Sequence, residues 1–382
     1  MPTWSVYTGG NDPHDGIDQL PGPPPWRAFD GGPVLPPPPA TEDDTSVSPD
    51  RLHRARSYVA GPDSVQLVNA ALVLRRPLLV TGPPGTGKSS LAYAVARELR
   101  LGPVLRWNIT SRSTLGDGLY RYDPLSRLYA ARRTVWQTAP QDAGRAYEGD
   151  ERRPYGEERR AAGDGRPVGD GGRPVRDRAE GVGVGADVED HLRLGPLGTA
   201  LLPHARPRVL LVDEIDKSDL DLPNDLLNVL EEGQYEIPEL QRAAGRSGGG
   251  AEVLADGTDV PVRVAGGLVR CRAFPFVVLT SNGEREFPPA FLRRCVRLRL
   301  RHPDREQLTE IVRAHLTDTA PGAAEHLIDR FLSRAAGGEL ATDQLLNALY
   351  LTGVAGLDAD SRDALADELM PYLSATADGD GF

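Results

Sequence analysis

One segment of the chain has the residue types and spacing of a phosphate-binding loop. Residues 82–89 read Gly-Pro-Pro-Gly-Thr-Gly-Lys-Ser and satisfy the pattern G-x-x-x-x-G-K-[ST]. In such a loop the backbone N–H groups surround phosphate oxygens, the lysine contacts the β- and γ-phosphates, and the serine hydroxyl binds Mg²⁺. We therefore predict ATP and Mg²⁺ as cofactors. The predicted nucleotide-binding residues are Gly82, Pro83, Pro84, Gly85, Thr86, Gly87, Lys88, Ser89 and Ser90, with Ser89 also on the metal.

A pair of acidic residues follows a second apolar segment. Residues 209–212 are Val-Leu-Leu-Val, and Asp213 and Glu214 come directly after them. A carboxylate at the end of a buried strand can bind the metal of a nucleotide site, so Asp213 is the second predicted metal ligand. Glu214 is the predicted general base, because phosphoryl transfer to water needs a proton acceptor near the γ-phosphate.

Further polar residues are candidates for contact with the γ-phosphate. Asn282 follows the apolar segment 274–280 and is predicted to hold the attacking water or to contact the phosphate; a plain turn residue is the alternative. Arg293 and Arg294 precede the apolar segment 296–300, and either could stabilise negative charge in the transition state. A surface ion pair is the alternative for both arginines.

The hydrophobic pattern predicts the elements that position these residues. Segments 78–81, 209–212, 274–280 and 296–300 are typical of buried or half-buried strands, and residues 89–100 have their apolar positions on one helical face. Alternating strands and helices predict an α/β fold, the doubly wound parallel sheet of a P-loop NTPase. After residue 302 the pattern is helical throughout, which predicts a small all-helical domain.

Composition divides the chain further. We expect a Pro-rich, largely disordered tail at 1–50, a nucleotide-binding α/β domain at 51–301 with a low-complexity insert at 139–190, a helical lid domain at 302–373 and an acidic tail at 374–382. The predicted tail at 1–50 contains four aromatic residues, which disordered segments usually lack. Part of the tail could therefore dock on the folded body instead. The four aromatic residues are Trp4, Tyr7, Trp26 and Phe29.

Charge and cysteine content argue against several function classes. Lys and Arg number 44 against 55 Asp and Glu, a formal net charge of −11, so we do not expect nucleic acid or anionic lipid as a partner. Cys271 and Cys295 cannot build a disulfide framework, and the histidines form no ligand-spaced pair. The sequence shows neither an apolar run long enough for a bilayer nor a signal peptide, so we expect a cytoplasmic protein with no membrane partner.

Together the motifs resemble AAA+ ATPases of the MoxR-like, helix-2-insert group. The resemblance covers roughly residues 58–373 and rests on the phosphate-binding loop, on residues 213–217 (Asp-Glu-Ile-Asp-Lys), on Asn282 and on residues 287–294. It implies an AAA+ core in which Asp213 and Glu214 form the Walker B pair and Asn282 is sensor 1. It also implies that Arg294 is the finger that reaches the neighbouring subunit, and hence a homo-oligomer, most often a hexameric ring.

A narrower resemblance concerns residues 107–122 and 221–225, which are similar to actinobacterial ATPases encoded beside von Willebrand A-type domain proteins in predicted conflict systems. It implies a protein client, with such a domain protein as the candidate. The chain departs from many AAA+ proteins at residues 339–344, which contain no sensor 2 arginine; Arg334 is the alternative. Asp216 and Lys217 are expected to form local ion pairs.

The predicted function is Mg²⁺-dependent ATP hydrolysis by a ring-forming ATPase that remodels or activates protein partners. One alternative is a nucleic-acid-directed motor, which would need basic residues facing the pore and would show salt-sensitive DNA binding. Another is an ATP-binding switch or scaffold with little turnover. Glu214 argues against the switch, whereas the missing sensor 2 arginine favours it.

Overall fold

The computed structural model describes residues 4–10, 12–36, 48–129, 188–247, 250–316, 321–335, 340–354 and 359–371. The chain forms two compact units, one of residues 1–122 with 192–382 and one of residues 123–191. In the second unit the described residues include the 3₁₀ helix η4 (Val188–His191), and the Asp123 N–H donates to the His191 carbonyl at 2.9 Å. The predicted insert at 139–190, apart from residues 188–190, and the predicted tail at 374–382 lie outside the described residues.

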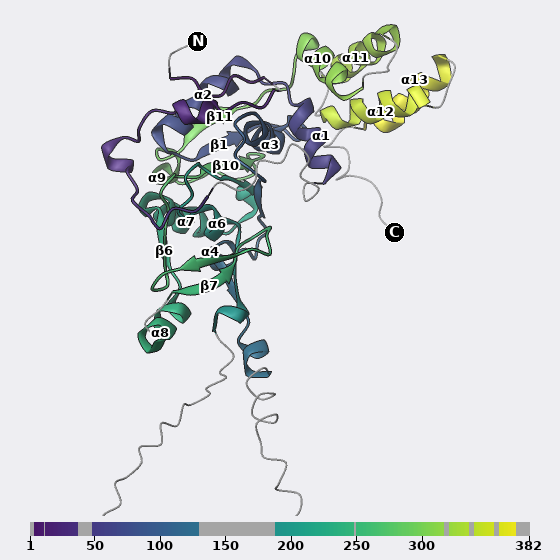
Figure 1. The fold of residues 1–382 in the computed structure, drawn as a ribbon. Helices are drawn as coiled ribbons and strands as arrows, with labels where there is room; N and C mark the ends of the chain where they lie inside the picture. Colours follow the sequence, from purple (N-terminus) through teal and green to yellow (C-terminus); the bar gives the residue numbers. More distant parts are fainter. Residues whose placement is uncertain are drawn as a thin grey trace, which may run out of the picture. The chain divides into compact units, whose positions relative to one another are not determined.

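A five-stranded parallel sheet forms the centre of the first unit (Figure 1). Its strand order is β11-β1-β10-β5-β2, and all four pairings are parallel. The strands are β1 (Leu78–Thr81), β2 (Leu105–Asn108), β5 (Val209–Asp213), β10 (Phe276–Ser281) and β11 (Val296–Arg299). The register places Thr81 opposite Ser281 and Asn108 opposite Asp213, so the polar strand ends lie at one edge. This arrangement confirms the predicted parallel α/β fold.

Helices cover this sheet and complete the core. Helix α3 (Lys88–Glu98) packs on β5 and β10, and α2 (Pro62–Leu74) packs on β1 and β11. Helix α1 (Pro49–Ser57) contacts α3, and α7 (Leu222–Glu232) contacts the short helix α9 (Pro289–Leu292). Leu91, Val95 and Leu99, the predicted apolar face of α3, are fully buried.

Smaller sheets follow the edge strand β2. Strands β3 (Tyr120–Tyr122), β4 (Leu192–Leu194), β7 (Ala251–Leu254) and β8 (Pro261–Val264) form a four-stranded sheet, and β6 (Gln234–Glu236) pairs with β9 (Leu268–Arg270). The short helices α4 (Leu115–Leu119) and α6 (Pro196–Ala200) contact one another, and α8 (Pro238–Ser247) follows β6. Figure 1 shows these elements grouped around α4, β7 and α8.

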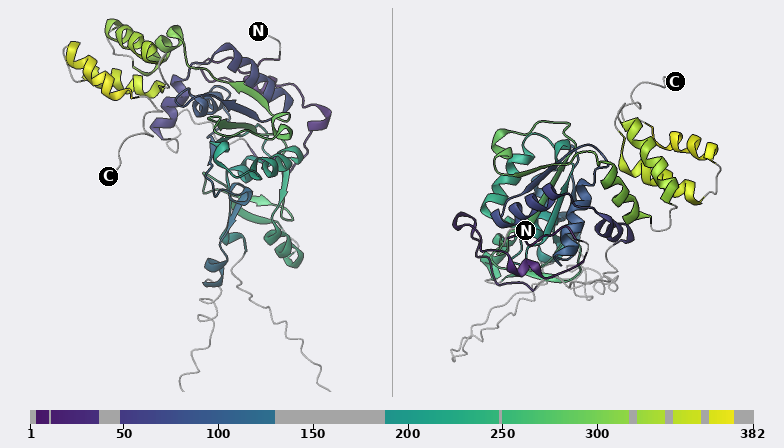
Figure 2. Two further views of the ribbon diagram at one scale, coloured as in Figure 1. Left: turned by 180° about the vertical axis from the view of Figure 1, so that it is seen from behind. Right: turned by 90° about the horizontal axis from the view of Figure 1, so that it is seen from above.

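The C-terminal part is helical, as predicted, and has an apolar core of its own. It consists of α10 (Arg305–His315), α11 (Pro321–Ala335), α12 (Thr342–Val354) and α13 (Ala359–Leu369), seen from two further directions in Figure 2. Asp304 and Gln307 form a capping box that starts α10. Leu308, Leu327, Phe331 and Leu345 are at most 1% exposed within this core. Across the described helices, none combines the length and apolarity needed to cross a membrane.

Residues 4–10 and 12–36 pack on the folded core, which is the docking that the sequence left open for part of the tail predicted at residues 1–50. Tyr7 is 1% exposed, and the N–H groups of Val6 and Tyr7 donate to Oδ1 of the buried Asn69 at 2.7 and 2.9 Å. The hydroxyl of Thr8 donates to the buried Glu98 at 2.9 Å. The segment is ordered because its apolar side chains join the core and two buried polar residues bind its backbone. Residues 37–47 of the predicted tail lie outside the described part.

Arg27 anchors the same segment at the ends of two helices. Its side chain is buried, and it donates to the carbonyls of Arg75, Leu230 and Glu231 at 2.6–3.1 Å. These carbonyls lie at the C-terminal ends of α2 and α7, where a cation is favoured by the helix dipole. Its guanidinium also lies over the rings of Phe29 and Phe274, at 5.3 and 4.6 Å.

The substitution Arg27→Ala is expected to lower the free energy of unfolding by about 2–4 kcal/mol, because it leaves buried helix-end carbonyls without a donor. Urea unfolding followed by circular dichroism measures this, and limited proteolysis should show earlier cleavage within residues 4–36. Arg313→Ala, on the exposed face of α10, is the matched control. Equal midpoints for both variants would contradict the anchoring role.

Candidate nucleotide-binding site

The predicted phosphate-binding loop connects β1 to α3 in the structure, as the motif requires. Gly87 precedes the helix with φ +80°, a left-handed conformation that favours glycine. A Cβ atom on Gly82 would lie 2.5 Å from the Leu300 carbonyl oxygen, so only glycine allows this approach to the end of β11. The loop therefore depends on the glycines of the motif for its shape.

Lys88 points back into the loop. Its Nζ donates to the carbonyls of Gly82 and Pro83, both at 2.8 Å, and the residue is 9% exposed. Burial lowers the pKa of Lys88, and the nearby carboxylates of Asp216, Asp213 and Glu214 oppose this shift. An ammonium group enclosed by the loop is placed to contact phosphate groups held by the same loop.

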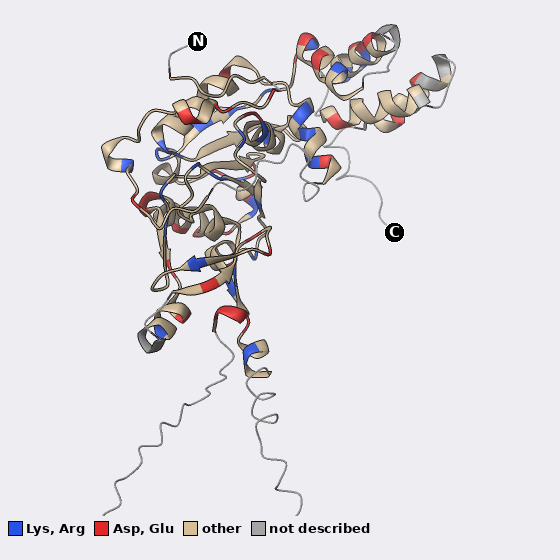
Figure 3. Cartoon of the chain, viewed as in Figure 1, with Lys and Arg blue, Asp and Glu red and all other residues tan. Residues whose placement is uncertain are grey.

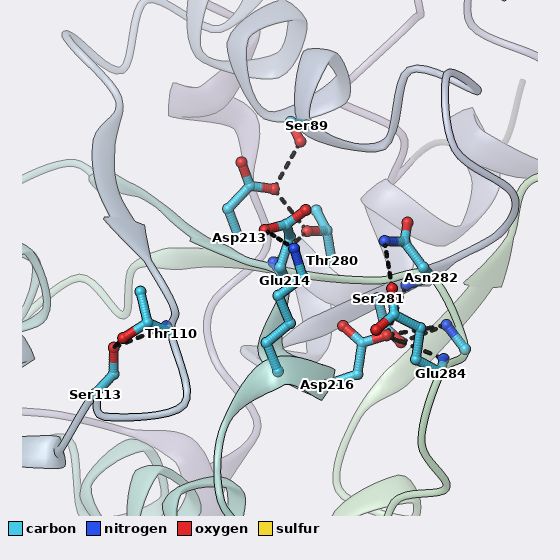
Figure 4. Close-up of polar contacts among 12 residues, drawn as sticks. Ser89, Thr110, Ser113, Asp213, Glu214, Asp216, Thr280, Ser281, Asn282 and Glu284 are labelled. Carbon is cyan, nitrogen blue, oxygen red and sulfur yellow. Dashed lines mark hydrogen bonds and ion pairs between the residues drawn. The ribbon is translucent and has the colours of Figure 1, made fainter. Parts of the chain in front are cut away.

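Asp213 joins the loop to the next strand of the sheet. Its Oδ1 accepts hydrogen bonds from Ser89 Oγ and Thr280 Oγ1, both at 2.7 Å, as Figure 4 shows. Its Oδ2 accepts from a guanidinium nitrogen of Arg106 at 2.8 Å. Burial raises the pKa of Asp213, but the hydrogen bonds from Thr280, Ser89 and Arg106 outweigh it and hold the pKa below its usual value. The carboxylate is therefore kept ionised beside the Ser89 hydroxyl.

These residues fit a magnesium ion held together with a nucleotide. No cluster of three or more His, Cys, Asp or Glu side chains suited to a metal occurs in the described part of the chain. Mg²⁺ keeps several waters and is commonly bound by one or two protein groups plus substrate phosphates. Ser89 Oγ and the Asp213 carboxylate are two such oxygen donors, and they already lie at hydrogen-bond distance.

Glu214 stands in a strained backbone conformation at the end of β5. Its φ is +63°, which costs a non-glycine residue about 1 kcal/mol or more. Its N–H donates to Thr280 Oγ1 at 2.9 Å, so Thr280 supports both acidic residues. The half-exposed Glu214 carboxylate pairs with Lys217 Nζ at 2.8 Å, which agrees with the predicted local ion pair of Lys217.

Asp216 organises the turn that carries Asn282. The carboxylate is 3% exposed, and its Oδ2 accepts from Ser281 Oγ at 2.9 Å. The same oxygen accepts the N–H groups of Asn282, Gly283 and Glu284 at 2.9–3.2 Å. Asp216 thus binds the end of β10 instead of forming the predicted ion pair. Within the described part of the chain, the Asn282 side chain makes one long contact, to Glu284 at 3.4 Å (Figure 4).

A cleft of about 1100 Å³ brings most of the predicted site residues together. Residues 84–90 line it with Asp213, Glu214, Thr280 and Asn282, and residues 57–59 and 341–343 contribute to its walls. Gly82 and Pro83, the first two residues of the loop, do not line the cleft. Seven of the nine predicted nucleotide-binding residues, the predicted metal ligands and the predicted base therefore share one cavity.

The predicted arginines are not part of this cleft. Arg294 follows α9, where its Nε lies 3.6 Å from a carboxylate oxygen of Glu231 on α7. Arg293 is exposed. Arg334, the alternative for sensor 2, donates to Asp367 and to the Met370 carbonyl within the helical part and does not line the cleft. The cleft of the chain itself is therefore lined neither by Arg294, the predicted finger, nor by Arg334, the alternative for sensor 2.

Sequence reasoning missed Thr280 and Arg106, and it expected only a local ion pair of Asp216. Thr280 and Asp216 connect β5 to β10, and Arg106 reaches Asp213 from β2. Thr280 was part of a predicted strand, and its position two residues before Asn282 is the signal that could have identified it. No comparable signal exists for Arg106, because its contact depends on which strand neighbours β5.

Comparisons with known proteins agree with this site in part. The sequence model of the family described as "ATPase family associated with various cellular activities (AAA)" matches residues 78–120, from β1 through the phosphate-binding loop to the start of β3. No curated protein matches the chain. The crystal structure of the FIGL-1 AAA domain in complex with ADP covers 87% of this chain and 84% of its own length, at 15% identity and a TM-score of 0.32.

The family match concerns the segment that carries the phosphate-binding loop. Residues 78–120 carry the sequence of an AAA ATPase domain, and they lie within a mostly parallel α/β sheet of the kind predicted. The overlap with the FIGL-1 domain is too weak to add to this assignment. An ATPase with a nucleotide-binding P-loop is the class supported by the family match.

We expect Asp216→Ala to lower the free energy of unfolding by about 2–4 kcal/mol, because four donors lose a buried, charged acceptor. Chemical denaturation measures the loss. Asp225→Ala, an exposed aspartate on α7, is the control and should change stability little. The role given to Asp216 would be wrong if its variant were as stable as the control.

Proposed function

We propose that the chain binds ATP with Mg²⁺ at the phosphate-binding loop and hydrolyses it to ADP and phosphate. The observation that carries the proposal is the contact between Ser89 and Asp213 at 2.7 Å, which unites two motifs separated by 124 residues. Thr280 adds the end of a third strand to the same carboxylate oxygen. A P-loop serine beside an ionised aspartate is the arrangement that holds the metal in P-loop NTPases.

Each cleft residue has a role in this reaction. Residues 82–90 would bind the phosphates, with Lys88 on the β- and γ-phosphates, while Ser89 and Asp213 would hold the ion, which supplies charge neutralisation when bound. Glu214 would accept the proton of the attacking water, since its carboxylate is exposed to the cleft at the strand end. Asn282 would orient that water or contact the γ-phosphate. Lys217 restrains the base before nucleotide binds.

A ring assembly would bring Arg294 to a cleft that it does not line in its own chain. Arg294 lies outside its own cleft, beside Glu231, so we propose that it acts in the cleft of a neighbouring subunit. A transition-state arginine of this kind contributes about 10³–10⁵ in rate in related phosphoryl transfers. We propose a homo-oligomer, a hexameric ring, of the MoxR-like type.

The client proposed for this ring is a protein that the ATPase remodels or activates, with a von Willebrand A-type domain protein as the candidate. The net charge of −11 supports a protein client over nucleic acid. We expect the activity in the cytoplasm, where the two free cysteines, Cys271 and Cys295, remain reduced.

Glu214→Gln is expected to reduce steady-state ATP turnover about 10²-fold or more while nucleotide binding persists, because the amide cannot accept the proton. Hydrolysis is measured against protein concentration with light scattering alongside, and wild-type turnover should rise with assembly. The control is Glu286→Gln, because Glu286 is an exposed glutamate in the segment that follows β10. Tight ATP binding by the wild type without turnover at any concentration would instead support the nucleotide switch.

Arg294→Ala is expected to abolish turnover and to leave ATP binding intact. Mixing this variant with Glu214→Gln subunits should restore part of the activity, because each supplies what the other lacks at a shared interface. Arg293→Ala is the matched control and decides which of the two adjacent arginines acts. Wild-type turnover in Arg294→Ala would exclude it as the finger.

A further inference from the structure

A second cavity, of about 410 Å³, lies beside the edge strand β2 and is lined by four arginines. We call it the arginine pocket and define it by Arg106, Arg112, Arg121 and Arg193. Asp117 and Asp256 are the acidic residues in its lining. None of the functions proposed for the nucleotide cleft uses this cavity.

The arginines of the pocket are poorly neutralised. Arg121 on β3 and Arg193 on β4 stand directly opposite one another in the antiparallel register, and like charges in that position repel. The Arg112 guanidinium makes no hydrogen bond or ion pair with any residue that the structure describes. Arg193 binds the Thr258 carbonyl and lies 3.6 Å from Asp259, whose side chain is almost fully exposed.

The two acids of the pocket offset this charge only in part. The Asp117 carboxylate is engaged in the capping box of α4, where it accepts from the N–H and hydroxyl of Thr114 at 2.8 Å. The half-buried Asp256 carboxylate receives no hydrogen bond from a described residue. Burial raises the pKa of Asp256, and the nearby arginines only partly oppose this. Among the lining side chains, four guanidinium groups face two carboxylates, and Asp213, outside the lining, pairs with Arg106. The lining itself therefore holds more cationic than anionic groups.

We propose that the arginine pocket binds the carboxylate groups of an acidic segment of a protein partner. Guanidinium groups present paired N–H donors that match a carboxylate. Trp107, Leu194 and Pro196 add apolar wall for the carbon chain of an acidic side chain. Nucleic-acid binding draws its affinity from many phosphate contacts, which one compact pocket on a chain of net charge −11 does not supply.

Arg106 connects the pocket to the nucleotide cleft. One guanidinium nitrogen donates to Asp213 Oδ2 at 2.8 Å, whereas its Nε is buried without a partner. A carboxylate bound in the pocket competes with Asp213 for the same guanidinium. A carboxylate bound in the pocket therefore changes the charge beside Asp213, the proposed metal ligand, and with it the affinity for nucleotide. Linkage requires that nucleotide change the affinity for the carboxylate by the same factor. This step rests on the proposed function, whereas binding to the pocket itself does not.

The test is the binding of a fluorescein-labelled oligoglutamate peptide to the full chain, measured by fluorescence anisotropy at low salt without nucleotide. We expect saturable binding that Arg112→Gln and Arg193→Gln each weaken by about tenfold, the effect of losing a charge-assisted hydrogen bond. Arg313→Gln, an exposed arginine on α10, should leave the affinity unchanged. Binding that is absent, or equal in the wild type and both pocket variants, would overturn the proposal.

Two further arms separate the remaining outcomes. The first arm uses a labelled oligodeoxynucleotide of the same charge as the peptide. If it binds more tightly than the peptide, and the same variants weaken its binding, the assignment of a protein partner is overturned. Addition of saturating MgADP is expected to change the peptide's affinity in the wild type. An unchanged affinity would contradict the sharing of Arg106. Failure of ATP hydrolysis alone would not affect the nucleotide-free arm, so the two proposals fail separately.

Discussion

The buried carboxylate of Asp213 is the constraint on which the site depends. It accepts from Ser89 at the start of α3, from Thr280 on β10 and from Arg106 on β2, so three elements meet at one side chain. An ionised carboxylate taken out of water is costly unless its oxygens are hydrogen-bonded. These donors satisfy both oxygens and at the same time fix where the phosphate-binding loop stands against the sheet.

The same principle operates one turn further along the chain. Asp216 is buried, and the turn after β10 folds around its Oδ2, which places Asn282 at the rim of the cleft. The parallel register makes both contacts possible, because β1, β5 and β10 end at one edge of the sheet. Basic and acidic residues are interspersed along the chain (Figure 3). The site therefore relies on these local contacts. Short-range hydrogen bonds determine the geometry, whereas the net charge of the chain does not.

Much of this could be predicted from the sequence. The strands of the central sheet are continuous apolar runs, and the loop at 82–89 has a spacing that few other structures require. The contacts of Thr280, Asp216 and Arg106 could not be predicted, because they depend on strand order and register. The sequence left the packing of residues 4–36 open for a similar reason: its partners, Asn69 and Glu98, lie about 60–90 residues away, and neither carries a local pattern. The ring and the role of Arg294 remain predictions from resemblance and placement.

In the proposed reaction, Ser89, Asp213 and Lys88 exchange their present hydrogen bonds for contacts with Mg²⁺ and a triphosphate. The most direct measurement is a crystal structure of the chain with Mg²⁺ and a non-hydrolysable ATP analogue. We expect Lys88 Nζ to have moved from the carbonyls of Gly82 and Pro83 to the phosphates, and Ser89 and Asp213 to hold the metal. A triphosphate bound elsewhere, or bound with Lys88 still on those carbonyls, would contradict it.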